Sequence, residues 1–497
     1  MKTSRTFIKF LSLLLAVALI MSLAACGTQG TQSPPSDSPI ATAPSEPPKN
    51  NAKYTADGKR IITIGTWYDK YYVSKHTDIY DDPSVVESDG TEAGDKQILI
   101  AETRLARIRE IEQKYNVVLE YVNLTFEGIQ ESISTSIPEG APDVDIYEVD
   151  TQFGIPAVIN GYGISLEDMG LEGTDVLGEQ TAMKYLQLMG QDESYLFNPS
   201  VTGATNAYVL AFNMDLINKA GLENPQDLYD RGEWTWDVWR DYLKKLTIDT
   251  DGDGAPNIYG YSGYWTYLLT NLMFANGTGI ATGETETISS AATVEVLQFI
   301  DKIYNTDKTA RPWDASNWEI NNRLYAEGLS GFWIGADWIF QENGAGELPF
   351  EIGVVPWPTG PHGDDATNKL SPPDGTWYFI PQGTEDPRLV YDVMFDWVDW
   401  YGGDKSLGED NDWSRKLYMN DRNFDYATMM ASRPGFDLWE SLGKTTAFSI
   451  MFMLSGQMTA DEVVERYKEP YQAAIDEFFG KEPRPTPTVE SAEEPAA

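Results

Sequence analysis

An alternation of strand-like and helix-like segments between residues 60 and 150 constrains the fold most strongly. The β-branched runs "RIITIGTW", "VVLEYV" and "DVDIYEVD" predict three strands. The two stretches between them carry apolar residues at helical spacing, one around Ile108 and the other from Phe126 to Ile137. Strands that alternate with helices in this way form a parallel sheet with right-handed crossovers. The first part of the chain is therefore predicted to be an α/β unit.

Candidate ligand-binding residues follow the strands of this unit. Trp67 and Tyr68 come directly after the first strand, and Asp150 ends the third. Open parallel sheets bind ligands at the carboxyl ends of their strands. An aromatic ring can stack on the apolar face of a sugar while a carboxylate bonds its hydroxyls. We therefore predict that these three residues take part in a ligand site.

A second α/β unit is predicted from about residue 205. The segment "AYVLAFNMDLINKAGL" reads as a strand that runs into a helix, and Thr235 is placed to cap the helix "TWDVWRDYLKKLT". Further helices are predicted near 265–276 and 290–305, followed by strands in "EIGVVPWP" and "GTWYFIP" and a helix in "PRLVYDVMFDWVDWYG". A chain of 497 residues is too long for one compact core, so two domains or two lobes are expected.

The N-terminus has the pattern of an export signal. Basic residues precede an apolar run that ends in "LAAC", which predicts a signal peptide over 1–25. This ending resembles the lipobox of bacterial lipoproteins, in which the cysteine, here Cys26, is lipidated; the alternative is an ordinary signal peptide with an incidental cysteine. Residues 26–59 are rich in Pro, Ser and Thr and predict a tether, and 481–497 predict a disordered tail.

Charge and histidine content argue against several functions. The chain has 77 acidic and 36 basic residues, a net charge of -41, which makes nucleic acid a poor partner. Its two histidines, His76 and His362, lie far apart in sequence, and no HExxH or GxSxG stretch is present. These features favour a binding protein over an enzyme, although carboxylate pairs suited to glycoside hydrolysis are expected by chance.

The segment "DTDGDG" resembles a calcium-binding loop. Asp249, Asp251 and Asp253 match its first, third and fifth positions, and Asn257 can serve the ninth. The twelfth position, normally a bidentate glutamate, is Gly260. The residues leave two interpretations, a structural calcium site or a solvated acidic turn beside the preceding helix. No other cofactor is predicted.

Six segments in a fixed order resemble one family: "FNMDLINKAGL", "TWDVWRDYLKKLTIDTDGDGAPNIYGY", "GFWIGADW", "IGVVPWPTGPHG", "IPQGTEDP" and "SGQMTADEVVE". They are similar to the carbohydrate-binding family of extracellular solute-binding proteins of ABC importers, which includes maltodextrin-binding proteins. The resemblance implies an α/β fold of the type II periplasmic-binding-protein kind, with two lobes joined by crossing strands and a ligand cleft between them. The expected N-terminal lobe comprises 60–204 and 356–406, and the C-terminal lobe 205–355 and 407–480.

The resemblance also implies roles for particular residues. Asp150 corresponds to a hydroxyl-binding acid, and Trp338 falls on the family's ligand-stacking tryptophan. The further candidates on the ligand are Trp265, Tyr267, Trp377 and Trp439. The tryptophans that we predict to be structural are Trp313, Trp318, Trp357, Trp397 and Trp400.

The implied partners are a mono- or oligosaccharide and the membrane subunits of an ABC permease. The implied protein is a monomer, anchored through Cys26 to the outer face of the bacterial cell membrane. Three alternatives remain: a binding protein for a non-sugar solute, one that serves a sensory partner, and an anchored glycan-active enzyme.

Overall fold

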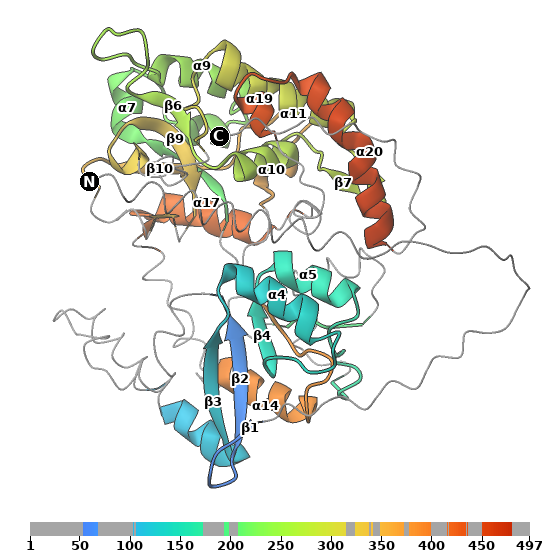
Figure 1. Cartoon of the computed structure of the whole chain (residues 1–497). Helices are drawn as coiled ribbons and strands as arrows, with labels where there is room; N and C mark the ends of the chain where they lie inside the picture. The colour runs from blue at the N-terminus through green and yellow to red at the C-terminus, as the bar shows by residue number, and fades with distance from the viewer. Residues whose placement is uncertain are drawn as a thin grey trace, which may run out of the picture. The chain divides into compact units, whose positions relative to one another are not determined.

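Two β-sheets with their covering helices form the frame of the protein, which we describe from a computed structural model (Figure 1). The residues that the structure describes are 53–67, 103, 106–171, 193–197, 207–314, 324–336, 339–340, 348–371, 377–398, 415, 417–433, 435 and 450–479. Among these residues, no helix has both the length and the apolar composition needed to cross a membrane.

The first sheet contains the three predicted parallel strands. β2 (Arg60–Thr66) pairs in parallel with β3 (Val117–Asn123) and with β4 (Ile146–Val149), which confirms the predicted strands and their direction. Two antiparallel strands, β1 (Lys53–Tyr54) and β11 (Trp377–Phe379), pair with β2 and β4 respectively. β1 lies inside the range 26–59 that the sequence assigned to the tether, so the sheet begins earlier than expected.

Helices cover both faces of this sheet. Neighbouring residues of β4 point to opposite faces, because side chains alternate along a strand. Tyr147 packs in one core cluster with α4 (Phe126–Ser136) and α5 (Thr151–Ile159), whereas Ile146 packs in another with the helical residues 106–115 and with α14 (Pro387–Val398). In Figure 1, α4 and α5 lie together beside β4, and α14 lies behind β2.

The second sheet has the order β10-β5-β9-β6. β5 (Val209–Asn213) is antiparallel to both β9 (Ser330–Gly335) and β10 (Ile352–Val355), and β6 (Tyr259–Ser262) is parallel to β9. The strands predicted around 209–213 and 352–355 are therefore confirmed. Every residue of β5, β9 and β10 is buried, which fits strands covered by helices on both faces.

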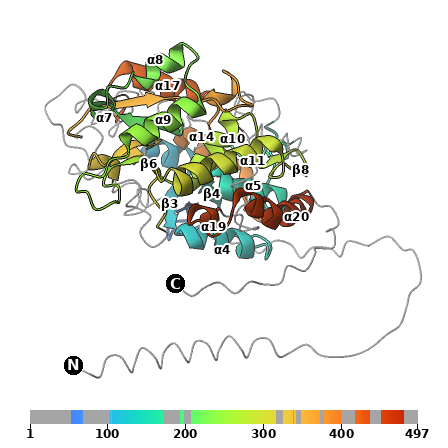
Figure 2. The ribbon, with the colours of Figure 1, turned by 90° about the horizontal axis from the view of Figure 1, so that it is seen from above.

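The helices predicted around the second sheet are present. They include α7 (Met214–Lys219), α9 (Trp236–Leu246), α10 (Trp265–Ala275) and α11 (Ala291–Asp301). α10 and α20 (Ala460–Phe478) both contact α11, as Figure 2 shows. These contacts form a helical layer beside the sheet.

The predicted N-cap position of α9 is confirmed, whereas the side-chain capping bond is not formed. Thr235 is the N-cap residue of α9, but its side chain makes no capping hydrogen bond. Its backbone instead forms a parallel bridge with Thr359, and the Trp236 N–H donates to the Thr359 carbonyl at 3.1 Å. The helix therefore starts against another segment of the chain rather than against its own side-chain cap.

Side-chain amides complete the hydrogen bonds of edge strand β10. Asn423 of α17 (Asp421–Ala431) accepts from the Val354 N–H at 2.9 Å and donates to the Ile352 carbonyl at 3.0 Å. Gln226 of α8 (Pro225–Asp230) donates to the Val354 carbonyl at 2.7 Å and to Asn423 Oδ1 at 2.9 Å. The outer side of β10 is thus satisfied by two side chains instead of a strand.

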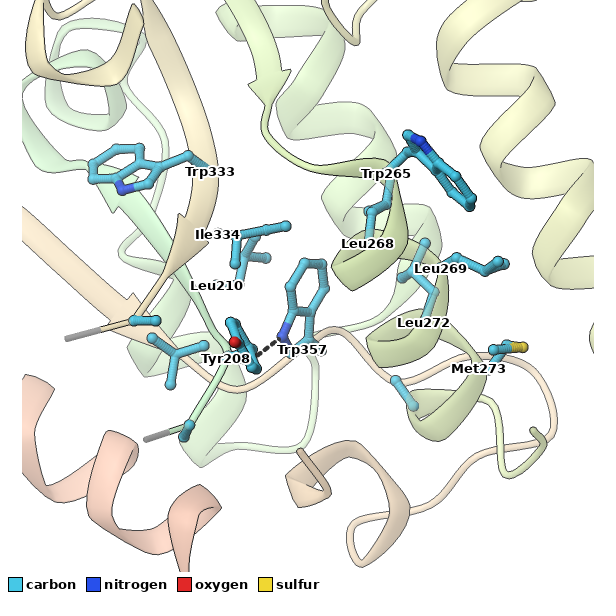
Figure 3. Packing of buried hydrophobic residues seen from close by; sticks show 14 of the residues in the cluster. Tyr208, Leu210, Trp265, Leu268, Leu269, Leu272, Met273, Trp333, Ile334 and Trp357 are labelled. Atoms are coloured by element: carbon cyan, nitrogen blue, oxygen red, sulfur yellow. Dashed lines mark hydrogen bonds between the residues drawn. The ribbon is translucent and has the colours of Figure 1, made fainter. Parts of the chain in front are cut away.

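The chain returns to the first sheet later than the expected boundary at 356. Trp357 is buried, as predicted for a structural tryptophan, and its indole N–H donates to the Tyr208 carbonyl at 2.7 Å (Figure 3). Gly360 N–H donates to the Ala275 carbonyl at 2.9 Å, and the hydroxyl of Ser371 accepts from the Tyr208 N–H at 2.9 Å. Residues 357–371 therefore pack with the second sheet, because their backbone and Trp357 find partners there.

Candidate ligand-binding site

The carboxyl ends of the three parallel strands bring several candidate residues to one edge of the first sheet. Trp67 follows β2, Phe126 begins the helix after β3, and Asp150 follows β4. The Leu124 N–H donates to the Thr66 carbonyl at 3.0 Å, which fixes the start of α4 against the end of β2. Strand-to-helix turns at this edge are where open α/β sheets hold ligands.

Three rings at this edge form what we call the first aromatic group: Trp67, Phe126 and Phe153. Trp67 meets Phe126 edge to face, with centroids 5.2 Å apart and an interplanar angle of 84°. Phe126 meets Phe153 in the same manner at 5.2 Å and 68°. Phe126 is 36% exposed and Trp67 is half-buried, so parts of these two apolar rings remain accessible.

A carboxylate and an amide stand beside the first aromatic group. Asp150 is the N-cap residue of α5, yet its side chain caps no backbone N–H. Its Oδ2 instead accepts a hydrogen bond from the amide nitrogen of Gln152. Carboxylate oxygens accept hydrogen bonds, and an amide both donates and accepts. The pair therefore has the chemistry that binds hydroxyl groups.

The second aromatic group lies at the start of α10 and contains Tyr208, Tyr264, Tyr267 and Trp313. Tyr208 stacks on Tyr267 with centroids 3.9 Å apart, and its hydroxyl donates to the Tyr267 hydroxyl at 3.0 Å. Tyr264 lies 6.1 Å from the Tyr267 ring and 6.2 Å from that of Trp313. Tyr264, Tyr267 and Trp313 are half-buried, so parts of their rings remain accessible.

Local structure explains why this second group forms. Gly263 joins β6 to α10 with a φ of 151°, and a Cβ atom there would lie 2.9 Å from the Tyr261 hydroxyl. Glycine is needed for both the dihedral angle and the close approach. Trp313 reaches the group because the preceding residues follow β6: the Arg311 N–H donates to the Tyr261 carbonyl at 2.9 Å.

The other predicted site residues occupy different places. Trp265 is 7% exposed and, in Figure 3, points away from Tyr208 and Trp357. Trp377 is 3% exposed in β11, opposite Val149. Both therefore present little surface to a ligand in this conformation. The predicted site residues that lie outside the described residues are Cys26, Tyr68, Trp338 and Trp439.

The sequence did not single out several members of the two aromatic groups. Phe126 and Phe153 were not candidates, although Phe126 follows a strand end and the strand-end rule could have found it. Tyr208 and Tyr264 carry no comparable signal, because the contacts that assemble them are tertiary. Trp313 was predicted to be structural, and its half-buried ring packs against the buried core while also lying 6.2 Å from the ring of Tyr264.

The aspartate loop joins α9 to β6 and is closed at its base by the paired backbones of Ile248 and Ile258. Carboxylate oxygens of Asp249, Asp251 and Asp253 lie within 4.8 Å of one another, and all three residues are exposed. The three carboxylates are therefore close enough to share a cation.

The same loop also satisfies its own acceptors. Asp249 accepts from the Gly252 N–H at 2.6 Å and from the Gly254 N–H at 2.9 Å, and these bonds lower the pKa of its carboxyl. Asn257 Oδ1 accepts from the Thr250 N–H at 2.6 Å. An ion could share the Asp249 oxygens with these hydrogen bonds, because a carboxylate offers about four lone pairs.

Comparison with known proteins identifies the family. Residues 103–406 match the model for bacterial extracellular solute-binding proteins, which is more than half of the chain. The protein belongs to this family. No curated protein matches its sequence. The family places this solute-binding protein outside the cytoplasm, and its members are in general binding proteins rather than enzymes.

Solved structures share the fold of this solute-binding protein. An ABC substrate-binding protein of Listeria monocytogenes, in complex with cycloalternan, has a TM-score of 0.57 and 14% identity, covering 85% of this chain and 99% of its own. The maltose/maltodextrin-binding domain of Bdellovibrio bacteriovorus, bound to maltotriose, has a TM-score of 0.53 and 14% identity, covering 84% and 99%. UgpB from Mycobacterium tuberculosis, in complex with glycerophosphocholine, has a TM-score of 0.54 and 16% identity, covering 77% and 96%. The fold is therefore the predicted two-lobed α/β fold.

Proposed function

We propose that this solute-binding protein captures a mono- or oligosaccharide and delivers it to the membrane subunits of an ABC importer. The observation that carries the proposal is the first aromatic group beside Asp150 and Gln152, at the carboxyl ends of the parallel strands. Rings next to a carboxylate and an amide match the two surfaces of a sugar, its apolar face and its hydroxyl groups.

The second aromatic group supports the same proposal. Its tyrosines combine an apolar ring with a hydroxyl, and Tyr267 was among the residues that the sequence predicted. In the proposed mechanism, a sugar that contacts both lobes favours the closed conformation over the open one. Trp265, Trp338, Trp377 and Trp439, together with Tyr68, remain proposed contacts of the closed state.

A non-sugar solute is the second candidate. Aromatic clusters also bind quaternary ammonium groups through cation–π attraction, and UgpB is a structural neighbour in complex with glycerophosphocholine. Two neighbours in complex with saccharides support the first candidate instead. The acidic residue Asp150 at the first aromatic group is compatible with either ligand, so the choice requires a binding measurement.

A thermal-shift panel tests the choice. We expect maltotriose, mannotriose, tagatose or cycloalternan to raise the melting temperature of the purified protein, because a ligand that binds only the folded state stabilises it. If glycerophosphocholine alone stabilised the protein, the proposed ligand would be a phosphodiester instead of a sugar. Stabilisation by peptides or polyamines, with none by any sugar, would overturn the carbohydrate proposal. Incubation with labelled glycans tests for turnover, which we expect to be absent.

We further propose that the mature protein is lipid-anchored at Cys26. The proposal rests on the "LAAC" ending of the export signal. Mass spectrometry of the mature N-terminus should find a diacylglyceryl-modified cysteine. A Cys26→Ser variant should leave the membrane fraction; a variant that stays there would contradict the anchor.

A further inference from the structure

A buried carboxyl lies directly behind the candidate ligand-binding edge of the first sheet. Glu148 of β4 is only 2% exposed. Its Oε1 accepts a hydrogen bond from the Tyr378 hydroxyl at 3.3 Å, and the Thr66 side chain is a second hydrogen-bond partner. Its Oε2 has no hydrogen-bond partner among the described residues.

Within the part of the chain that the structure describes, Glu148 has no ion pair, and the hydrogen-bond partners of its carboxyl are hydroxyl groups. β2 contributes the hydroxyl of Thr66, and β11 contributes the phenol of Tyr378. On α14, the Tyr391 ring packs on Phe197 with centroids 5.0 Å apart, and Phe197 packs on Tyr378 at 5.9 Å. Burial of Tyr391 raises its pKa to about 12, so it carries no charge near neutral pH.

Charged side chains of α14 and of the residue before β4 are bound to other partners. On α14, Arg388 is paired with Asp392, and Asp396 is paired with Lys114. The carboxylate that precedes β4, Asp145, is paired with Arg60 and bonds Thr63. Without a cation, burial raises the pKa of the Glu148 carboxyl to about 7, and the two hydroxyl bonds oppose this rise.

Glu148 links the three strands that carry candidate ligand residues. Its partner Thr66 immediately precedes Trp67, and its partner Tyr378 immediately follows Trp377. Glu148 itself lies two residues before Asp150 in the same strand end. The β4–β11 register places Glu148 opposite Tyr378 and Val149 opposite Trp377. Glu148 and its two hydrogen-bond partners therefore lie within two residues of Trp67, Trp377 and Asp150.

We propose that Glu148 is a positioning residue for the ligand site, and that loss of its proton displaces Trp67, Trp377 and Asp150 together. The neutral Glu148 carboxyl can donate its own proton in a hydrogen bond to the hydroxyl of Thr66 or of Tyr378. The carboxylate needs both hydroxyls as donors and draws water toward Oε2, because a buried unpaired charge is costly. The role of Glu148 in ligand binding rests on the proposed function. If the displaced residues bind ligand less well, the affinity is higher in acid than in mild alkali.

Fluorine NMR of the whole mature chain tests the displacement without any ligand. The protein is labelled with 5-fluorotryptophan, and the signals of Trp67 and Trp377 are assigned with Trp67→Phe and Trp377→Phe variants. We expect both signals to shift between about pH 5.5 and 8.5 with a common midpoint. Glu148→Gln should abolish the shift, because the amide is neutral at every pH. The matched control Glu120→Gln, on strand β3, should retain it.

A second variant keeps the test decisive if Glu148→Gln does not fold. Tyr378→Phe removes one hydrogen bond to the carboxylate and should move the midpoint to higher pH, since that bond favours the charged form. Signals that do not depend on pH, a titration that survives in Glu148→Gln, or an unchanged midpoint in Tyr378→Phe would overturn the proposal. The titration uses no ligand, so a failure to bind any sugar would overturn only the proposed function.

Discussion

Asn423→Ala is expected to lower the free energy of unfolding by about 3 to 5 kcal/mol. Asn423 is fully buried. Besides its two bonds to β10, it donates to the Tyr418 carbonyl at 2.8 Å and accepts from Gln226 at 2.9 Å. An asparagine amide has two donor hydrogens and an oxygen with two lone pairs. All four positions are used at once.

The magnitude follows from what the truncation leaves behind. The Val354 N–H becomes a buried donor without its acceptor, which costs about 1 to 3 kcal/mol. The carbonyls of Ile352 and Tyr418 each lose a bond, at about 1 kcal/mol apiece. Gln226 loses its bond to Asn423 but keeps its bond to the Val354 carbonyl, so the free-energy cost at Gln226 is smaller than at the other three groups.

Urea unfolding followed by far-ultraviolet circular dichroism measures the change. Asn420→Ala is the matched control: this residue caps the same helix through one bond, its Oδ1 accepting from the Asn423 N–H at 2.9 Å. Loss of such a cap costs about 1 kcal/mol. If Asn423→Ala costs no more than Asn420→Ala, water replaces the amide and the proposed role of Asn423 is refuted.

Four further outcomes are expected. Trp67→Ala should weaken binding of a stabilising sugar about tenfold in calorimetry, because aromatic contacts contribute about 0.5 to 1.5 kcal/mol beyond burial; an unchanged affinity would remove Trp67 from the site. Gly263→Ala should cost about 1 to 3 kcal/mol in urea unfolding, and a neutral effect would mean that the turn relaxes. Calcium should leave the melting temperature unchanged, because the twelfth position of the loop, normally a bidentate glutamate, is Gly260; a rise that Asp253→Ala abolishes would establish an ion site. The Glu148 pKa lies at about 7 when folded against its ordinary 4.5, so its contribution to stability is complete below pH 4.5 and is lost as the pH rises through 7. The total is up to about 3 kcal/mol, and Glu148→Gln should flatten that part of the stability profile measured by urea unfolding.

The three parallel strands of the first sheet could be predicted because they lie close together in sequence. β2 and β3 are runs of β-branched and aromatic residues, and the stretch between them carries apolar residues at helical spacing. β6 could not be predicted in the same way, since its four residues, "YGYS", include Gly260. A Cβ atom at Gly260 would lie 2.4 Å from the Leu243 carbonyl oxygen of α9. The glycine therefore serves close packing of a helix on a strand, a tertiary cause that no local pattern reveals.

The candidate site shows the same division. Trp67 and Asp150 were found because a strand end marks a ligand edge in a parallel sheet. Tyr208 was not found, because β5 is antiparallel to both of its neighbours and that rule does not apply there. Its stacking partner Tyr267 is 59 residues away in sequence, and only the folded arrangement of β5 and α10 brings the rings together.

The amides of Asn423 and Gln226 also decide what β10 can do to other molecules. A bare edge strand offers its N–H and C=O groups as a template for a strand of another chain, which leads to aggregation. Asn423 and Gln226 of the same chain already form hydrogen bonds with these backbone groups of β10. A strand of another chain can therefore pair with β10 only after α17 and α8 have detached from it.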